Sequence, residues 1–384
     1  MKTMIYADNA ATTKLDIDAF EAMKPFLLEE YGNTSQPYSF ARAGKKALKK
    51  ARAIIAECIG ALPEEVFFTS GGTESDNWAI KGIALQGGLC GEIITSSIEH
   101  HAVLRSCEAL KHLGVSVQYL PVTEKCIVQP TTLSNSITDR TKLVSVMLAN
   151  NEVGTIQPVS ELADIAHQSG VLFHTDAVQA IGHIEVNVRK LGVDLLSASA
   201  HKFNGPKGIG FLYIRKGTNI SPYVDGGVQE SGKRGGTENI ASIVAMATAL
   251  QKNCDNLKEN ALKLKHLESF VMDTLSAAGI DYIRNGSENR IPGNISLSFR
   301  NADGETLLHR LDLMGICVST GSACDAENTQ ISHVLKAIGI APEYAKGTIR
   351  LSFGSSNTES DALSLANAII RILSKNTSRV AVTL

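Results

Sequence analysis

Short runs of β-branched and aromatic residues alternate along this chain with segments of helical apolar spacing, and this alternation constrains the fold most strongly. Between two strand-like runs, for example, Leu162, Ile165 and Ala166 repeat at the spacing of one helix face. A strand followed by a helix, repeated, predicts an α/β fold with a mostly parallel sheet covered by helices on both faces. The predicted strands of this region are Val66–Thr69, Glu92–Thr95, Val115–Leu120, Lys142–Leu148, Val171–His174, Asp194–Ser197 and Ile209–Ile214.

A second, smaller region is predicted towards the C-terminus. A helical segment over Ala41–Cys58 precedes the alternating run, and a long helical stretch from Ile240 to about Ala278 follows it. Beyond that stretch we expect fewer strands and two helices, which favours an α+β domain. The strands expected there are Asn294–Phe299, Ile316–Ser319 and Thr348–Phe353. The predicted division is a large domain over residues 15–255 and a small domain formed by residues 1–14 and 256–384.

Composition and charge exclude several classes of protein. The 384 residues carry 37 Lys and Arg against 39 Asp and Glu, which predicts no direct nucleic-acid partner. The longest uncharged apolar run, Leu143–Ala149, is far too short to span a membrane, and the N-terminus shows no signal peptide. The cysteines form no C-x-x-C pair, so we expect reduced thiols and a cytoplasmic location. They are Cys58, Cys90, Cys107, Cys126, Cys254, Cys317 and Cys324.

Polar clusters follow five of the predicted strands, at the edge where open α/β sheets bind ligands. The Gly-rich turn Ser70–Ser75 opens a helix, and its free backbone N–H groups suit a phosphate. Taken singly, such residues are commonly helix caps or solvated side chains, but five clusters on one edge indicate a binding site. The other four are Glu99-His100-His101, Asn150-Asn151-Glu152, Asp176 with Gln179, and Ser199-Ala200-His201-Lys202.

The chemistry of these clusters fits pyridoxal phosphate (PLP) better than a nucleotide. No G-x-x-x-x-G-K-[ST] motif is present, and no G-x-G-x-x-G follows the first strand. PLP needs a lysine, a carboxylate facing its ring nitrogen, a phosphate cup and a flat group against its ring. The sequence offers Lys202, Asp176, the region of Thr73 and Ser199, and His100 for those four tasks.

Five motifs, in this order, resemble the class-V, NifS/IscS-like cysteine desulfurases over about residues 5 to 370. They are YADNAATT (6–13), FTSGGTESDN (68–77), NNEVG (150–154), SAHK (199–202) and GSAC (321–324). The resemblance implies a PLP enzyme of fold type I, the aspartate-aminotransferase type, with a large domain built on a seven-stranded sheet. It also implies a homodimer that converts L-cysteine to L-alanine and leaves an enzyme persulfide.

The resemblance further implies roles around the cofactor ring. Lys202 is similar to the lysine that forms the Schiff base with PLP. His100 resembles the residue that stacks on the ring and shuttles protons, and Asp176 the partner of the ring nitrogen. Gln179 and Asn151 resemble neighbours of the ring O3 oxygen, and Asn151 also approaches the substrate carboxylate.

The phosphate and substrate contacts are likewise implied by resemblance. Gly72, Thr73, Ser199 and His201 resemble the phosphate cup, and Thr237 resembles the ligand that the family supplies from the partner subunit. For the substrate, Arg350 resembles the carboxylate clamp and Asn33 a residue at the entrance, and a bidentate guanidinium suits that clamp. No metal ligand is expected.

Cys324 distinguishes the activities on this fold. Buried packing is the ordinary state of cysteine, and Cys58 and Cys317 fit it, one on a helix and one in a strand. Cys324 lies instead in a polar, small-residue stretch, Ser319–Asn328, which predicts an exposed loop. A thiolate on such a loop can attack the substrate sulfur and carry the persulfide to an acceptor. The acceptor expected is an iron–sulfur scaffold or a thiolation protein, which includes partners in tRNA or DNA modification.

Two departures from the family pattern and two alternative functions stay open. Tyr38 stands where Gly-Asn-Pro-Ser-x-x-His usually ends, and Ile331 stands in a stretch where Pro-Ser is common, although GSAC resembles the long-loop group I enzymes. One alternative is another class-V PLP reaction, such as that of a selenocysteine lyase, aminotransferase or epimerase. The other is a non-catalytic sulfur-assembly scaffold, which the intact Lys202, Asp176, His100 and Cys324 disfavour.

Overall fold

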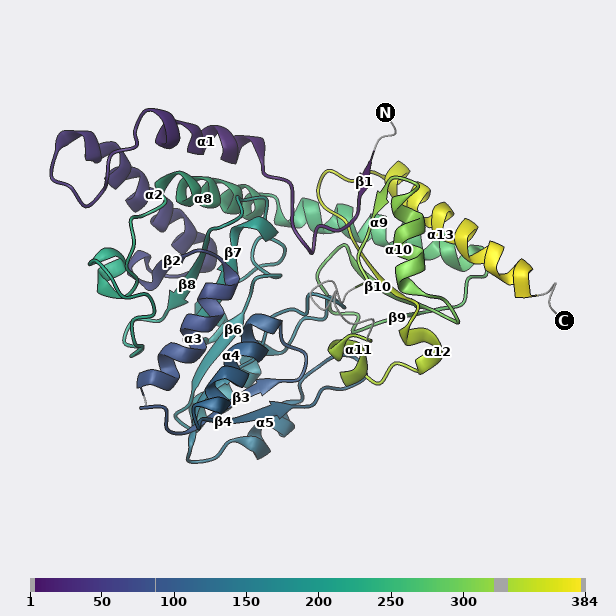
Figure 1. Cartoon of the computed structure of the whole chain (residues 1–384), viewed down its shortest axis with the longest axis horizontal. Helices are drawn as coiled ribbons and strands as arrows, with labels where there is room; N and C mark the ends of the chain where they lie inside the picture. Colours follow the sequence, from purple (N-terminus) through teal and green to yellow (C-terminus); the bar gives the residue numbers. More distant parts are fainter. Residues whose placement is uncertain (1–3, 87, 321–330, 381–384) are drawn as a thin grey trace.

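A seven-stranded sheet forms the centre of the larger part of the molecule in a computed structural model, which describes residues 4–86, 88–320 and 331–380 (Figure 1). The strand order is β2-β8-β7-β6-β5-β3-β4. Only β8 runs antiparallel to its two neighbours among these described strands, and the other pairings are parallel. The predicted α/β fold with a mostly parallel sheet is therefore confirmed.

The strands and helices alternate as the sequence predicts. The strands are β1 Ile5–Tyr6, β2 Val66–Thr69, β3 Glu92–Ser96, β4 Ser116–Leu120, β5 Thr141–Ser145, β6 Leu172–Asp176, β7 Leu195–Ser199, β8 Gly210–Ile214, β9 Tyr282–Arg284, β10 Asn294–Phe299, β11 Ile316–Cys317 and β12 Thr348–Ser352. The helices are α1 Ile17–Leu28, α2 Arg42–Ile59, α3 Gly72–Gln86, α4 His101–His112, α5 Pro130–Ser136, α6 Val159–Gln168, α7 Val188–Leu191, α8 Ile240–Asp255, α9 Leu257–Ala277, α10 Gly304–Asp312, α11 His333–Ala337, α12 Pro342–Ala345 and α13 Glu359–Val380. None of the helices in the described ranges is both long and apolar enough to cross a membrane.

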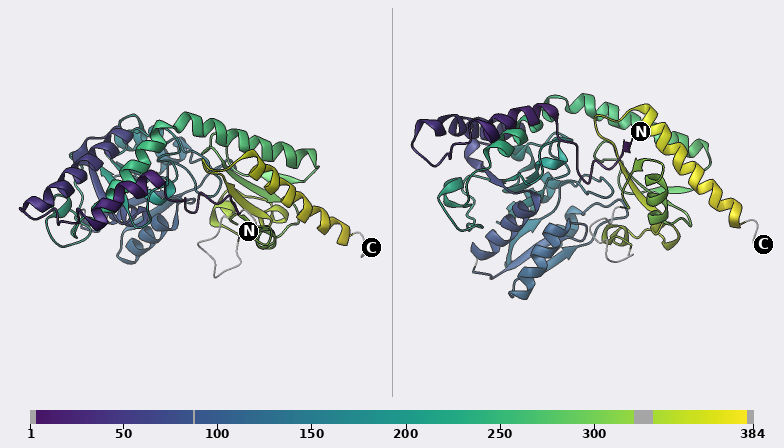
Figure 2. Two further views of the ribbon diagram at one scale, coloured as in Figure 1. Left: turned by 90° about the horizontal axis from the view of Figure 1, so that it is seen from above. Right: turned by 45° about the horizontal axis from the view of Figure 1, so that its top comes forward.

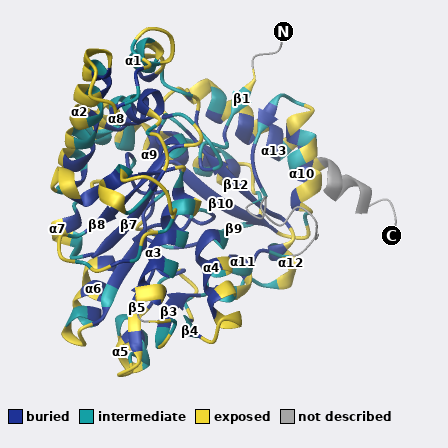
Figure 3. Cartoon of the chain, turned by 60° about the vertical axis from the view of Figure 1, so that its left-hand side comes forward, coloured by how far each residue is buried: buried dark blue, intermediate teal, exposed yellow. Residues whose placement is uncertain are grey.

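Both faces of the seven-stranded sheet are buried, and successive residues of each strand serve opposite faces (Figure 3). Phe67 packs into the core beneath α3 and α4, whereas its neighbour Phe68 packs into the core beneath α2, α6 and α8. Ile93 and Ile94 divide in the same way. This double coverage leaves the strand ends as the place where polar side chains reach a ligand.

A second, three-stranded antiparallel sheet, ordered β12-β10-β9, forms its own core with α9, α10 and α13 (Figure 2). The N-terminal strand β1 joins this part of the molecule, because Ile5 and Tyr6 pair with Ile316 and Cys317 of β11. The following residues run back to the large sheet. The chain start therefore links the two parts.

Several predicted elements differ from the observed ones. The predicted helical stretch from Ile240 to about Ala278 is present, but it consists of two helices, α8 and α9, which meet at Asn256. At this junction the Asn256 side-chain amide donates to the Lys252 carbonyl, as does its backbone N–H. The strand expected over Lys142–Leu148 ends at Ser145, and beyond that point the Leu148 carbonyl accepts a hydrogen bond from the Gln157 N–H.

The region after residue 280 also holds more structure than the two helices predicted. Four helices, α10 to α13, lie among the described residues there, and β9 was missed because it is a half-buried strand of three residues. The strands expected to end at Ser319 and Phe353 stop at Cys317 and Ser352, and Ser319 forms an isolated bridge with Arg350.

Candidate active site

A cavity of about 300 Å³ lies where β6 and β7 end and α3 and α4 begin. It gathers most of the residues singled out in the sequence, from segments as far apart as the chain start and β12. The predicted residues that line it are Gly72, Thr73, His100, Asn151, Asp176, Gln179, Ser199, His201, Lys202 and Arg350. Polar strand ends and helix starts therefore converge on one site, as the α/β pattern requires.

Lys202 lies in a short 3₁₀ turn, Ala200–Lys202, directly after β7. Its Nζ donates to the carbonyls of Ala10 and Ala11 at 2.7 and 2.8 Å, and its own carbonyl contacts His183 Nε2 at 2.8 Å. These contacts fix the amine inside the cavity.

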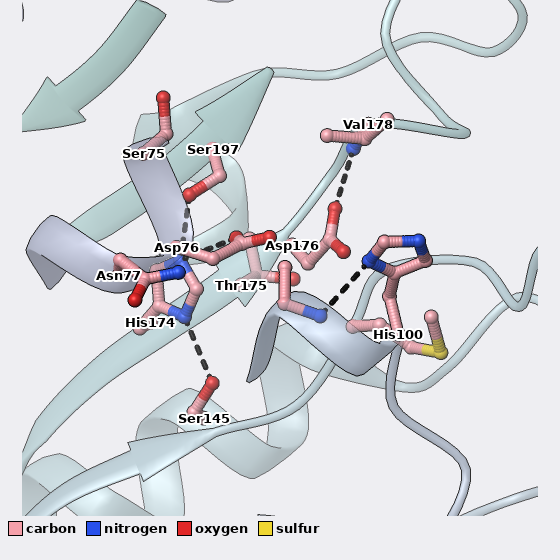
Figure 4. Close-up of polar contacts among 12 residues, drawn as sticks. Ser75, Asp76, Asn77, His100, Ser145, His174, Thr175, Asp176, Val178 and Ser197 are labelled. Carbon is pink, nitrogen blue, oxygen red and sulfur yellow. Dashed lines mark hydrogen bonds and ion pairs between the residues drawn. The ribbon is translucent and has the colours of Figure 1, made fainter. Parts of the chain in front are cut away.

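Asp176 ends β6 and is 5% exposed, with Oδ1 accepting a hydrogen bond from the Val178 N–H at 2.9 Å (Figure 4). Burial raises the pKa of Asp176 to about 6, although the Val178 N–H and the charge of Lys202 act in the opposite direction. A cationic ring N–H beside this carboxyl would favour its ionised form. The residue therefore fits the partner of a pyridinium nitrogen.

His100 caps the N-terminus of α4, where its Nδ1 accepts a hydrogen bond from the Ala102 N–H at 3.1 Å. Burial lowers the pKa of His100 to about 4, and the charges of Lys202 and His101 act in the same direction. The ring is therefore neutral at physiological pH and carries its proton on Nε2. A neutral, fixed imidazole of this kind can lie against a flat ring and donate a hydrogen bond from its Nε2.

The start of α3 forms a cradle with Ser199 at the end of β7. Gly71 has φ +149°, and a Cβ on Gly72 would lie 2.7 Å from Val178 Cγ2, so only glycine allows this close approach. The free N–H groups of a fifteen-residue helix, with the Thr73 hydroxyl, suit an anion. His201 lies at the same site with its Nδ1 3.1 Å from Thr12 Oγ1, and burial lowers its pKa to about 4.

Arg350 on β12 reaches the opposite wall of the cavity. Its Nη2 donates to Asp8 Oδ1 at 2.7 Å and its Nη1 to the Asn151 carbonyl at 2.9 Å. The guanidinium is buried, and its Nε has no hydrogen-bond partner. A fixed, buried guanidinium with spare donor capacity suits a carboxylate.

Two predicted residues lie outside this cavity. Asn33 accepts a hydrogen bond from the Ser35 N–H, and Thr237 is exposed. Their segments lie side by side, because Thr34 Oγ1 donates to Glu238 Oε2 at 2.7 Å. A further predicted residue, Cys324, lies outside the described residues.

Sequence reasoning missed several residues of the site. Asp8 holds Arg350, and Asp76 lines the cavity beside Asp176. The carbonyls of Ala10 and Ala11 hold Lys202. Asp8, Ala10 and Ala11 belong to the motif at residues 6–13, so its match to the family was the one signal that pointed to them.

The donor set fits PLP on the chemistry of its residues. An amine, a buried carboxyl, a neutral imidazole and a glycine cradle at a helix start all face one cavity. The predicted ring and cup residues therefore lie where a phosphorylated pyridine would need them. This combination defines the class of protein: an α/β enzyme with a PLP-type site.

Comparison with known proteins gives the family. The model of the class-V aminotransferases matches residues 5–365, so the chain belongs to that family. Cysteine desulfurase IscS of Dictyoglomus turgidum is 48% identical, over 98% of this chain and 96% of the relative.

Solved structures agree with this assignment. A NifS-like protein is 40% identical, with a TM-score of 0.91 over 97% of this chain and all of that chain. A structure described as SspA in complex with cysteine is 33% identical, with a TM-score of 0.81 over 91% of this chain and 99% of that one. The resemblance to NifS/IscS-like proteins, the fold type and the PLP cofactor are thereby confirmed.

Proposed function

We infer that the protein is a PLP-dependent cysteine desulfurase, which converts L-cysteine to L-alanine and carries the sulfur as a persulfide on Cys324. The observation that carries this function is the cavity in which Lys202, Asp176, His100 and Arg350 meet. The identity to cysteine desulfurases over nearly the whole chain supports it.

The cofactor is held by residues of the cavity. Lys202 is the amine for the aldehyde carbon, Asp176 the partner of the ring nitrogen and His100 the group against the ring face. Gln179 and Asn151 serve the ring oxygen. The phosphate is held by Gly72, Thr73, Ser199 and His201, with Thr237 from the partner subunit.

Substrate binding uses the opposite wall. The guanidinium of Arg350, oriented by Asp8 and the Asn151 carbonyl, binds the carboxylate of L-cysteine. The Asn151 side chain assists, and Asn33 lies at the entrance. Because Asp8 and Asn151 occupy two of its nitrogens, the clamp is oriented before the substrate arrives.

The reaction needs proton transfer at Cα and sulfur transfer at Sγ. When bound, PLP supplies an electron sink for the bonds at the substrate Cα. Lys202 is the base within the cavity that moves the Cα proton. His100 can shuttle this proton when its Nδ1 releases the Ala102 N–H.

Sulfur transfer follows at the thiol. The Cys324 thiolate bonds to the substrate Sγ as the Cβ–Sγ bond breaks, and the released electron pair stays on carbon. Protonation of that carbon gives the methyl group of alanine. L-cysteine and an enzyme thiol thus become L-alanine and an enzyme persulfide, so the sum needs no external oxidant.

The assembly proposed is a homodimer of two-domain subunits. The exposed position of Thr237, outside the cavity of its own chain, supports a role in the partner's phosphate site. The division at residues 15–255, with 1–14 and 256–384 as the small domain, is supported by the helix break at Asn256 and by the pairing of β1 with β11.

The persulfide passes to an acceptor protein, for which we propose an iron–sulfur scaffold or a thiolation protein. Relatives bearing the name IscS support a role in sulfur transfer. A reactive Cys324 thiolate requires reducing surroundings, so we propose that the protein acts in the cytoplasm.

Mapping the persulfide tests this function. The PLP-loaded protein is incubated with L-cysteine, alkylated without reductant and digested. The masses of the cysteine-containing peptides are then measured by mass spectrometry. We expect one extra sulfur atom on the Cys324 peptide and none on that of the exposed Cys90. Alanine release without sulfur on Cys324 would instead favour a lyase.

A further inference from the structure

A second buried carboxyl, Asp76, lies beside Asp176 (Figure 4) and lines the same cavity, and the proposed reaction gives it no task. Asp76 is in the second turn of α3 and is 1% exposed. One oxygen of each carboxyl and one ring nitrogen of His100 lie within 4.8 Å of one another. When two carboxyls lie this close together and out of water, the charge of one disfavours ionisation of the other, so the pKa of one of them is raised strongly.

Among the residues that the structure describes, those that act on the pKa of Asp76 are Asp176, Ser197 and Glu99, and none of them carries a positive charge. The ring of His174 on β6 places its Nε2 3.7 Å from Asp76 Oδ1. Burial lowers the pKa of His174 to about 3, so this ring is neutral. Glu99, which precedes His100, also raises the pKa of Asp76 where it is ionised.

The two carboxyls are not equivalent. Asp176 accepts the Val178 N–H and faces the charge of Lys202, both of which favour its ionised form. Asp76 bonds with Ser197 on β7, but its Oδ1 has no hydrogen-bond partner. The carboxyl that is easier to neutralise is therefore Asp76.

We propose that Asp76 and Asp176 hold one proton between them, that this proton resides on Asp76, and that Asp76 thereby keeps Asp176 ionised towards the ring nitrogen of the cofactor. Asp76 is a positioning residue, since it acts through Asp176. The cofactor part of this inference rests on the proposed function, whereas the shared proton does not.

A chain of groups behind Asp76 accommodates its proton. Ser197 Oγ lies 3.0 Å from His174 Nε2, and Ser145 Oγ lies 2.8 Å from His174 Nδ1 (Figure 4). Hydroxyls and a neutral imidazole each donate and accept, so they can reverse direction when Asp76 gains or loses its proton. No net charge needs to enter the core.

Carbon-13 NMR of the full-length protein, labelled at the Asp carboxyls alone, tests the shared proton. Without PLP, we expect one Asp resonance of the protonated type at pH 7, which is lost in Asp76→Asn. In Asp176→Asn, Asp76 should titrate at lower pH, because its charged neighbour is gone; this variant serves if Asp76→Asn does not fold. No protonated Asp resonance at pH 7, or one unaltered in both variants, would overturn the proposal.

Thermal unfolding against pH supplies a second readout. An acid whose pKa is raised on folding loses its stabilising contribution as pH rises, so Asp76→Asn should gain in Tm over the wild type increasingly from pH 4 upward. The exposed Asp273→Asn should show no such trend. A Tm difference that does not change with pH would mean a purely structural role and would contradict the proposal.

Loading with PLP separates this inference from the proposed function. If the two carboxyls share a proton but the protein binds no PLP, the shared proton stands and the proposed function is contradicted. If the protein binds PLP and forms alanine with both carboxyls ionised, only the shared proton is contradicted. If the pair acts on the ring nitrogen, Asp76→Asn shifts the pH at which the absorption of bound PLP changes, and an unshifted spectrum would remove its link to the cofactor.

Discussion

The cofactor cavity and the surface that carries Asn33 and Thr237 differ in how far one chain completes them. In the cavity, Lys202 is bound by two backbone carbonyls and Arg350 by Asp8, and these groups are largely out of solvent. Around the other surface the chain exposes large apolar side chains. Tyr31 is 68% exposed and Val228 is 87% exposed.

This difference between the cavity and the surface separates the groups that one subunit supplies alone from those that a second subunit would supply. The residues proposed as base, ring partner and carboxylate clamp, Lys202, Asp176 and Arg350, line a cavity of one chain. We therefore expect one chain to supply the groups for proton transfer and substrate binding. Thr237 lies on a surface with exposed apolar neighbours, and such a surface is expected to be covered by a second copy of the chain. Thr237 could then reach the phosphate site of that copy. The predictions below test how sharp this division is.

The largest effect is expected inside the cavity. Lys202→Ala removes the amine that holds the cofactor and the base that moves the Cα proton, so turnover should fall on the order of 10⁴-fold. Alanine release from L-cysteine measures it. The exposed Lys216→Ala is the matched control and should retain wild-type turnover; a comparable loss there would point to general damage.

A mixed dimer tests the second surface. Thr237→Asp should raise the dissociation constant for PLP about 100-fold, because a carboxylate would face the phosphate of the partner's site. Mixing Thr237→Asp with Lys202→Ala chains should restore activity, since one site of the mixed dimer then has both native groups. Mixtures no more active than their components would show that Thr237 does not serve the partner.

A smaller effect is expected at the carboxylate clamp. Asp8→Asn replaces a charge-assisted hydrogen bond to Arg350 with a weaker one, so KM for L-cysteine should rise about 10-fold while kcat changes little. Initial rates over a range of L-cysteine concentrations measure both constants. The exposed Asp139→Asn serves as control. A fall in kcat with unchanged KM would place Asp8 in the chemical step instead.

The smallest effect is expected on the free energy of unfolding, through the buried carboxyl of Glu99. Burial raises the pKa of Glu99 to about 8, against the hydrogen bonds from Ser96 and the Met147 N–H. Its contribution to the free energy of unfolding is therefore full below about pH 4.5 and lost as pH rises to about 8.

Glu99→Gln cannot ionise, so it should gain a few kcal/mol relative to wild type between those two pH values, by the order of magnitude that such a shift implies. Denaturant titrations at pH 4.5 and pH 8 measure the gain. An equal difference at both pH values would show that Glu99 does not change its protonation within this range.

Much of the site follows from sequence because the fold is an alternation of local patterns. Once β6, β7 and the start of α3 were predicted, Asp176, Lys202 and Thr73 had to lie at one sheet edge. Which reaction they serve came from the resemblance of the motifs, above all GSAC.

The remainder could not be predicted because it depends on contacts between distant segments. Asp8 pairs with Arg350, 342 residues away, and no periodicity announces such a contact. In the sequence, Asp76 is indistinguishable from a solvent-exposed carboxyl on a helix. Its burial beside Asp176 arises only when α3 packs on the sheet. The junction of α8 and α9 at Asn256 could not be placed within the predicted helical stretch, because the apolar pattern continues across it.

The central claim is that the cavity and Cys324 together make a desulfurase. The most direct measurement is alanine released from L-cysteine, with a thiol reductant present, by the PLP-loaded wild type and by Cys324→Ala, with Cys90→Ala as the control. The account predicts alanine and sulfide from the wild type and the control and none from Cys324→Ala. Equal alanine from all three would contradict it and make a lyase that releases its chalcogen directly the better reading.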